Sequence, residues 1–260
     1  FQHALAYAKE RRQGKVGGSG TIVEHADVRR MLTAMKTDLF AARSISYSCA
    51  TAIDLAKSTD DKDWAARAAF LTPIAKAFGS DTGIGVASEG MQVHGGMGFI
   101  EETGAAQYLR DARITSIYEG TNGIQAMDLV ARKMMDGGEA AYRLLDEIEA
   151  SAEVARNTLP DLAEEVWSAA ETLREATEWL TGQEMNDRFA GAVPYLRAFA
   201  RVLGGHFHLK AALAEGGDGA RTALARFYLK RLLPEHGSLL TQAREGAEGL
   251  YALTPDELAG

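Results

Sequence analysis

Residues 28–53, VRRMLTAMKTDLFAARSISYSCATAI, are the stretch that decides the fold class of this chain. Apolar side chains recur along it every three or four residues, which is the spacing of one face of an α-helix. The pattern persists for about seven turns. The apolar positions are Val28, Leu32, Met35, Leu39, Ala42, Ile45, Cys49 and Ile53. A one-sided stripe of this length predicts a helix packed in a bundle.

The sequence on either side predicts further helices joined by short connections. Four glycines between Gly14 and Gly20 interrupt the first helical pattern. Pro73 should kink the helix that follows the long one, or divide it into two. The helices predicted here cover residues 1–12, about 63–93, 105–112 and 121–135. We therefore expect an all-α chain that begins with an up-and-down helical bundle.

The sequence changes character after Asp136, which two glycines follow. A heptad-like apolar stripe between acidic faces then predicts a long helix. The stripe consists of Leu162, Val166, Ala169, Leu173, Ala176 and Leu180. Three more amphipathic helices are predicted at about residues 195–214, 220–233 and 238–252. These observations predict two domains, a bundle over residues 1–136 and an additional helical packing domain over residues 137–260.

Composition narrows the functional class. The 260 residues carry a formal net charge of −8, which argues against nucleic acid or an anionic membrane as the main partner. The single cysteine, Cys49, cannot form an internal disulfide, and this favours a reducing, cytoplasmic location. No apolar run is long enough to span a membrane. Because the chain starts at Phe1, we expect it to be the middle of a longer protein whose targeting signal is not observable.

Three motifs carry chemistry. Ile117-Tyr118-Glu119-Gly120-Thr121 places a carboxylate on the last extended residues before a helix, with a glycine beside it for close approach of a ligand. Upstream lie the segments Gln92-Val93-His94-Gly95-Gly96-Met97-Gly98-Phe99 and Tyr108-Leu109-Arg110-Asp111-Ala112-Arg113-Ile114. Together these residues resemble the carboxyl-terminal helical part of an acyl-CoA dehydrogenase, a flavoenzyme that desaturates acyl thioesters.

The resemblance implies that Glu119 is the catalytic base. In that family the acid of the Tyr-Glu-Gly-Thr turn abstracts a proton from the carbon next to the thioester carbonyl, while a hydride leaves the next carbon for the flavin. Such a base must be desolvated to raise its pKa, and the carbonyl oxygen must accept hydrogen bonds. By the same resemblance Tyr118 and Gly120 contact the substrate. A solvated turn glutamate is the alternative reading of the pentapeptide alone.

The resemblance also implies a set of FAD contacts. Gln92, Gly95 and Gly96 would meet the adenosine diphosphate part of a flavin held mainly by a neighbouring subunit. The run Glu10–Lys15 resembles the family's Glu-Arg-x-x-Phe-Gly-Lys segment, so Arg11 would pair with the flavin pyrophosphate and Gln13 would contact the cofactor. That segment lacks the family's Phe here. Thr121 is a good helix N-cap, and with Asn122 it would also contact the flavin.

Other polar residues are given structural roles or none. Arg110 and Asp111 are expected to form an ion pair that fixes the approach to the Glu119 turn. His206 and His208 stand two apart on a predicted helix and so point to different faces, and the remaining histidines have no partner at ligand spacing. The sequence therefore predicts no metal site.

The resemblance extends to a larger branch of the family, which carries an additional helical domain and includes methylthio-acyl-CoA dehydrogenases. The amino-terminal helical and β-barrel domains of the family are absent from residues 1–260. The implied partners are an acyl-CoA substrate, an electron-transfer flavoprotein as electron acceptor, and further copies of the chain in a dimer or tetramer. The alternatives are an acyl-CoA oxidase with the same base and a non-catalytic helical interaction module.

Overall fold

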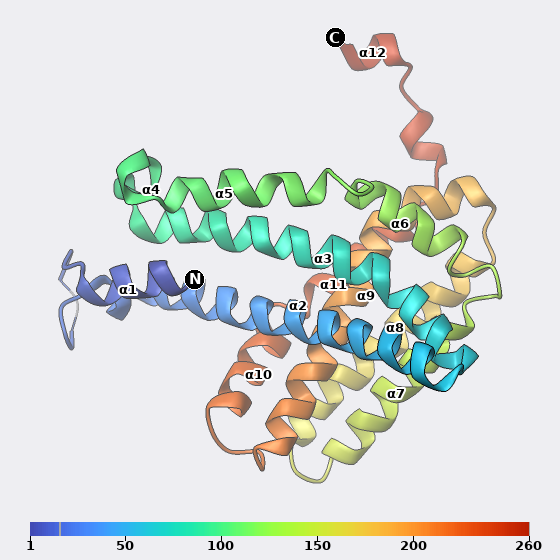
Figure 1. The fold of residues 1–260 in the computed structure, drawn as a ribbon, viewed down its shortest axis with the longest axis horizontal. Coiled ribbons are helices and arrows are strands. Elements are labelled where there is room, and N and C mark those ends of the chain that lie inside the picture. The colour runs from blue at the N-terminus through green and yellow to red at the C-terminus, as the bar shows by residue number, and fades with distance from the viewer. Residues whose placement is uncertain (16, 260) are drawn as a thin grey trace.

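The computed structural model describes residues 1–15 and 17–259. Within these ranges the chain consists of helices and turns, with an isolated bridge between Arg12 and Thr21 and no strand (Figure 1). The all-α prediction is confirmed. The helices are α1 (Gln2–Glu10), η1 (Ile22–Glu24), α2 (Ala26–Thr59), α3 (Lys62–His94), α4 (Gly96–Phe99), η2 (Glu101–Thr103), α5 (Ala105–Arg113), η3 (Ile114–Ser116), α6 (Asn122–Ala131), α7 (Glu139–Ala155), α8 (Pro160–Thr181), α9 (Met185–Ala214), α10 (Ala220–Arg231), α11 (Glu235–Ala243), η4 (Glu248–Tyr251) and α12 (Pro255–Ala259).

The framework of the fold is a pair of long antiparallel helices, α2 and α3, joined by a tight turn (Figure 1). Asp60 closes α2 in the left-handed conformation, and the Asp61 side chain then caps α3 by accepting from the Asp63 N–H at 2.8 Å. Pro73 lies inside α3, and the helix continues through it. The helix is therefore not divided into two at Pro73. Helix α5 runs back along α3 toward the start of α6 (Figure 1).

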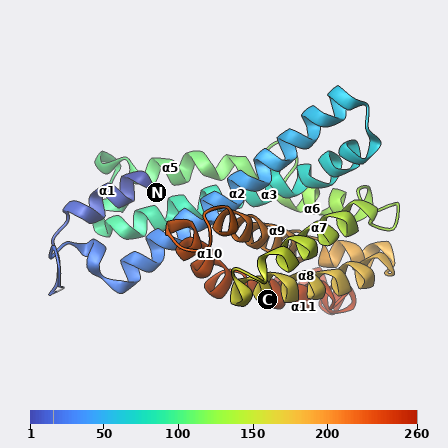
Figure 2. The same cartoon turned by 90° about the horizontal axis from the view of Figure 1, so that it is seen from below.

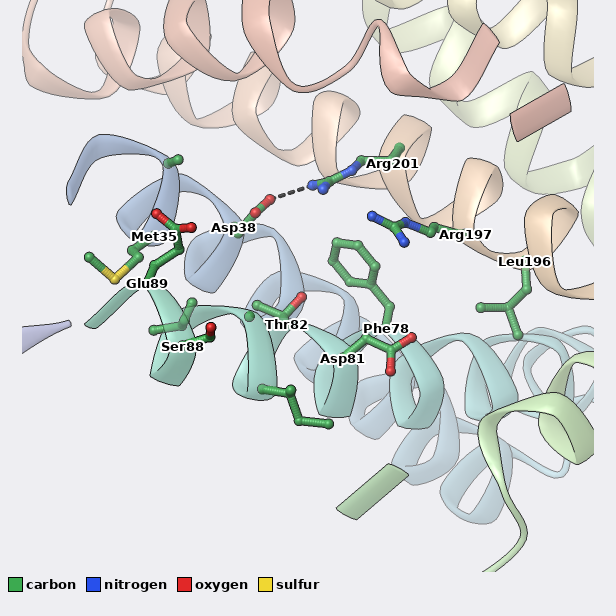
Figure 3. A pocket seen from close by; sticks show the side chains of 14 residues that line it. Met35, Asp38, Phe78, Asp81, Thr82, Ser88, Glu89, Leu196, Arg197 and Arg201 are labelled. Carbon is green, nitrogen blue, oxygen red and sulfur yellow. Dashed lines mark hydrogen bonds and ion pairs between the residues drawn. The ribbon is translucent and has the colours of Figure 1, made fainter. Parts of the chain in front are cut away.

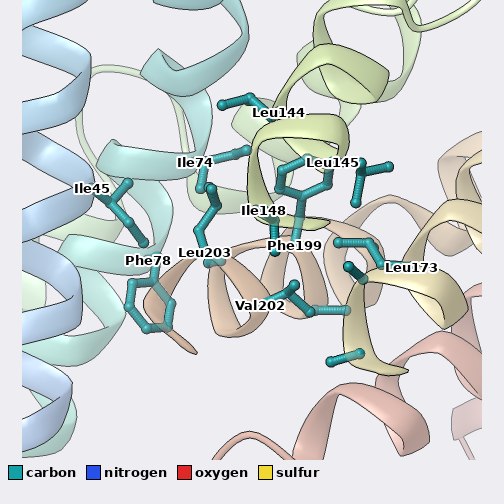
Figure 4. Close-up of a cluster of buried hydrophobic side chains, with 14 of the residues drawn as sticks. Ile45, Ile74, Phe78, Leu144, Leu145, Ile148, Leu173, Phe199, Val202 and Leu203 are labelled. Atoms are coloured by element: carbon teal, nitrogen blue, oxygen red, sulfur yellow. The ribbon is translucent and has the colours of Figure 1, made fainter. Parts of the chain in front are cut away.

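Helices α7 to α11 lie on one side of this framework (Figure 2); α7, α9 and α10 contact the long pair, and α8 and α11 pack on α9. Ile45 and Ile74 from the long pair meet Leu144, Leu145 and Phe199 in one buried cluster (Figure 4). The stripe predicted on α8 is fully part of this core. Since apolar burial of this extent is the main favourable term in folding, the long pair and helices α7 to α9 stabilise one another. The division into residues 1–136 and 137–260 stays a prediction.

The largest differences from the prediction lie in α7, α9 and α11. Helix α7, Glu139–Ala155, was not predicted, and α9 begins at Met185, ten residues before the predicted start. The last predicted helix, residues 238–252, is divided, because α11 ends at Ala243 and η4 follows a turn in which Gly246 has φ +70°. The Asp187 carboxylate holds that turn by accepting from the Ala247 N–H at 2.8 Å.

One partly buried ion pair joins α9 to α2 (Figure 3), and a second joins α9 to α11. The Arg201 guanidinium, only 9% exposed, binds the Asp38 carboxylate of α2 and donates from Nε to Glu235 Oε2 at 2.6 Å. Burial raises the pKa of Asp38 even though Arg201 opposes that shift. The cavity beside these groups, between α2, α3 and α9, has a volume of about 410 Å³. Because its arginines already bind carboxylates of the same chain, we interpret this cluster as structural.

Among the described residues, no helix combines the length and the apolar composition that a membrane span requires.

Candidate active site

Glu119 lies in the turn between η3 and α6. The Ile117 and Tyr118 N–H groups both donate to Ile114 O, at 2.9 and 3.1 Å, so helical winding continues up to the turn. Glu119 then has φ +56° and Gly120 has φ +84°. The prediction that Glu119 ends an extended segment is therefore wrong. Its backbone is left-handed, as is that of the glycine beside it.

This conformation needs support from its surroundings. A left-handed backbone costs a residue other than glycine about 1–2 kcal/mol. Gln125 Nε2 donates to Glu119 O at 3.1 Å, and Thr121 Oγ1 accepts from the Ile124 N–H at 3.3 Å, which confirms the predicted cap of α6. No described residue accepts a hydrogen bond from the Glu119 N–H. That N–H is therefore free to donate to a ligand.

Helix α3 contacts the turn through residues that the sequence analysis did not single out. Lys76 Nζ donates to Gly120 O at 2.6 Å and to Asn122 Oδ1 at 2.9 Å. Asn122 Nδ2 in turn donates to Asp81 Oδ1 at 2.7 Å and to Ser80 Oγ at 3.0 Å. No local sequence pattern marks Lys76, because its partners lie 44 and 46 residues further along the chain.

The surroundings of the Glu119 carboxylate are apolar but open. Ile114, Ile117, Tyr118 and Ile124 are each about half exposed, between 47% and 54%. Glu119 is itself exposed. The sequence argument required a desolvated base, and the described residues of this chain do not bury it. Several exposed apolar side chains close in sequence to one exposed carboxylate are typical of a surface that binds an apolar ligand or further protein.

The second group of predicted site residues lies where α3 ends. The Gly95 N–H donates to Gln92 O at 3.0 Å, and Gly95 has φ +61°, which ends the helix. Gln92, Gly95 and Gly96 are exposed, and a Cβ at either glycine would meet no other atom within 4 Å. The backbone here is therefore open to a ligand.

Arg11 and Gln13 lie at the same end of the molecule, in the segment that follows α1 (Figure 1). Ala4 and Ala8 of α1 pack in one cluster with Val93, next to Gln92. The Arg11 backbone is fixed, because its N–H donates to Tyr7 O at 2.9 Å and its carbonyl accepts from the Ile22 N–H at 2.8 Å. Both side chains are exposed, and Arg11 binds no carboxylate among the described residues. A free guanidinium of this kind suits a diphosphate.

The two groups of predicted residues are far apart. Sixteen residues of α3 separate Lys76, which contacts the Glu119 turn, from Gln92. At 1.5 Å per residue this is about 24 Å of helix axis. The structure thus brings Tyr118, Glu119, Gly120, Thr121 and Asn122 together at one place, and the loop after α1 together with the end of α3 at another.

The predicted ion pair between Arg110 and Asp111 is not present. Arg110 binds Glu101 instead through two parallel bonds, from Nη1 to Oε1 at 2.9 Å and from Nη2 to Oε2 at 2.7 Å. Consecutive residues of a helix point in different directions, so the pair could not form within α5. The bond to Glu101 ties α5 to the preceding turn η2.

Two family comparisons cover most of the chain. The family described as "Acyl-CoA dehydrogenase, C-terminal domain" matches residues 1–135, and the one described as "Acetyl-CoA dehydrogenase C-terminal like" matches residues 144–254. The first match includes every residue of both predicted groups.

Individual proteins agree with the family matches. The chain is 37% identical to a 3-methylmercaptopropionyl-CoA dehydrogenase of Ruegeria pomeroyi over 90% of this chain and 44% of the relative. It is 32% identical to the "Caffeyl-CoA reductase-Etf complex subunit CarC" of Acetobacterium woodii over 49% of this chain and 30% of the relative. Its fold is similar to an acyl-CoA dehydrogenase of Bacillus anthracis complexed with FAD, with TM-score 0.72 and 19% identity over 95% of this chain and 47% of that one. The chain thus spans less than half the length of these proteins.

Proposed function

Because this chain belongs to the acyl-CoA dehydrogenase family, we propose that it is the carboxyl-terminal part of a flavin-dependent enzyme that introduces an α,β double bond into an acyl-CoA thioester. The observation that carries this proposal is the Glu119 turn. It combines an exposed carboxylate, a left-handed backbone and a free N–H within one apolar surface.

Glu119 would act as the general base. Its carboxylate takes the proton from the carbon next to the thioester carbonyl, and its backbone N–H donates to the carbonyl oxygen. Tyr118 and Gly120 flank the base and would contact the thioester. A carboxylate in water is a weak base for such a proton, so the site needs a cover. We infer that bound substrate and residues outside this chain cover the apolar side chains around Glu119.

FAD, when bound, accepts the hydride from the neighbouring carbon. Thr121 and Asn122, at the start of α6, would meet it near the base, where helix N–H groups favour electron-rich atoms. Arg11, Gln13, Gln92, Gly95 and Gly96 are also suited to such a cofactor, since they offer a free guanidinium, an exposed side-chain amide and an open backbone. About 24 Å of helix separates the two groups, so we infer that they serve different FAD molecules.

Two flavins contacted by one chain require a second copy. We therefore propose a homo-oligomer in which the Arg11 and Gln92 group contacts the flavin of a neighbouring subunit. We also propose an electron-transfer flavoprotein as the electron acceptor, supported by the relative whose name includes an Etf complex. The methylthio-acyl thioester named in the Ruegeria relative is one candidate substrate.

The test uses the full-length protein that contains this chain. We expect it to retain a yellow flavin after desalting and to be bleached by an acyl-CoA thioester under anaerobic conditions. The variant Glu119→Gln should keep the flavin and lose proton abstraction, with a fall in rate of at least about 10³-fold. Bleaching by the variant at the wild-type rate would exclude Glu119 as the base. Rapid oxygen consumption during turnover would instead indicate an oxidase.

A further inference from the structure

Lys76 of α3 reaches the Glu119 turn from a different part of the chain. Its ammonium donates to Gly120 O at 2.6 Å and to Asn122 Oδ1 at 2.9 Å, and its side chain is partly buried. No carboxylate among the described residues lies within 4.0 Å of this ammonium. Both hydrogen-bond partners of the Lys76 ammonium therefore lie within three residues after Glu119, the proposed base.

The position of this charge is unusual. The N-terminus of a helix carries partial positive charge, so a cation near the start of α6 is electrostatically disfavoured. Specific hydrogen bonds must offset that cost, and the carbonyl of Gly120 and the amide oxygen of Asn122 provide them. A charge-assisted hydrogen bond to a carbonyl also fixes the orientation of a peptide unit more firmly than a neutral one. Here that peptide unit joins Gly120 to Thr121, one peptide unit beyond the one that follows Glu119.

Asn122 completes the connection to α3. Its amide oxygen accepts from Lys76, while its Nδ2 donates to Asp81 Oδ1 at 2.7 Å, Ser80 Oγ at 3.0 Å and Ala77 O at 3.3 Å. Both ends of the amide are thus bound to one rigid helix. The first residue of α6 and the carbonyl of Gly120 are consequently held in a fixed position relative to α3.

The turn requires such a hold because its backbone is strained. Glu119 has φ +56°, a conformation that persists only when the surrounding structure enforces it. Gln125 holds the Glu119 carbonyl from within α6 itself. Among the described residues, the hydrogen bonds that join the turn to a separate element are those of Lys76 and Asn122 with α3.

We propose that Lys76 is a positioning residue for Glu119: it holds the Gly120 carbonyl and the Asn122 side chain, and so sets where the carboxylate points. It does not touch the substrate. The proposal rests on the proposed function, because it assigns Lys76 a role in the step that Glu119 carries out.

The variants are Lys76→Met, which keeps the length of the side chain and removes the ammonium, and Lys76→Arg, which keeps the charge. Lys62→Met is the matched control, because Lys62 is exposed in the first turn of the same helix and binds no carboxylate among the described residues. All three are made in the full-length protein, for hydrogen exchange and for kinetics.

Hydrogen exchange tests whether the contacts of Lys76 with Gly120 and Asn122 hold the start of α6 in place. The Ile124 and Gln125 amides donate to Thr121 Oγ1 and Thr121 O at the start of α6. In Lys76→Met these amides should exchange about tenfold faster, while Lys62→Met should match the wild type. Equal exchange in the two variants would overturn the proposal.

Kinetics test the positioning role. In the full-length protein Lys76→Met should lower kcat for α-proton abstraction about 10- to 100-fold and change KM by less than about threefold, and Lys76→Arg should recover part of kcat. Faster exchange with an unchanged kcat would show that the Lys76 contacts stabilise the turn without positioning Glu119, and this would overturn the proposal. Glu119→Gln run alongside separates the two hypotheses, since its full activity would refute the proposed function whatever Lys76 does.

Discussion

Gly204 of α9 is the position where a single added methyl group should most disturb the packing of α9 against the long helices. A Cβ at Gly204 would lie 2.2 Å from Tyr228 Oη and 2.9 Å from the Ala41 Cβ. Tyr228 is fully buried and donates from its hydroxyl to Arg201 O at 3.1 Å. The ring therefore has to move, and the move breaks this hydrogen bond.

The magnitude for Gly204→Ala follows from three opposing contributions. Overpacking a close-packed core costs about 1–3 kcal/mol, and leaving a buried hydroxyl unpaired costs about 1–3 kcal/mol more. Alanine recovers about 1 kcal/mol because it favours the helix over glycine. We expect a net loss of about 3 kcal/mol in the free energy of unfolding.

The adjacent residue provides the control. A Cβ at Gly205 would meet only the ends of flexible side chains, Leu229 Cδ2 at 3.1 Å and Leu233 Cδ1 at 3.5 Å. The same gain in helix preference should then nearly balance a small repacking, so Gly205→Ala should stay within about 1 kcal/mol of the wild type. Urea unfolding followed by circular dichroism measures both variants. Equal stability of the two alanine variants would refute the reasoning, because they differ only in what the methyl group meets.

Two further predictions concern buried polar groups. Burial lowers the pKa of His208 to about 4. Below about pH 6.5 the unfolded chain therefore binds a proton that the folded chain excludes. The contribution of His208 to the free energy of unfolding is full above that pH and falls by about 3 kcal/mol as the pH drops to 4. His208→Gln should flatten this slope in urea unfolding measured at several pH values, and an unchanged slope would exclude His208 as its source. Thr177 Oγ1 lies 2.8 Å from Tyr195 Oη inside the core, so Thr177→Val should cost about 1–3 kcal/mol by leaving that phenol unpaired. A thermal unfolding midpoint equal to the wild type would contradict this.

Helix faces could be predicted from the sequence because burial follows the helical period. Most of the stripe on α2 and all of the stripe on α8 are buried. Helix α7 carries the same signal, although we did not identify it. Its buried positions follow the helical spacing, namely Ala140, Ala141, Leu144, Leu145, Ile148, Ala152 and Ala155. The apolar spacing after Gly138 is therefore itself sufficient to predict α7.

Helix ends were harder to predict, because distant residues decide them. The segment after Ala243 has helix-forming residues, and its pattern alone favours a continuous helix to residue 252. The helix stops before Gly246, whose φ of +70° is a local stop signal, and the Asp187 carboxylate, 60 residues earlier in the chain, holds the turn by accepting from the Ala247 N–H. A propensity argument has no access to that partner.

Some features of the candidate site are set by residues that are neighbours in the sequence, and others are set by residues far along the chain. The identity of Glu119 as the candidate base follows from the resemblance of its turn and of the two upstream segments to the family, and the cap at Thr121 follows from the residue type at the start of a helix. The left-handed backbone at Glu119 could not be predicted from the sequence, since a glutamate gives no local indication of positive φ. The contact of Lys76 with the turn could not be predicted either, because in the sequence Lys76 is an ordinary charged residue on a helix.

The basicity of Glu119 is a property that this chain does not determine alone. Local residues supply the carboxylate, the free N–H and the apolar side chains beside it, and α3 supplies the tie through Lys76. Desolvation, which turns a carboxylate into a base for a carbon acid, depends on what covers Ile117, Tyr118 and Ile124. About half of each of those side chains is exposed. Under the proposed function, contacts within residues 1–260 would position Glu119, whereas substrate and further protein would set the strength of the base by covering the turn, and the two properties should then be separable by mutation.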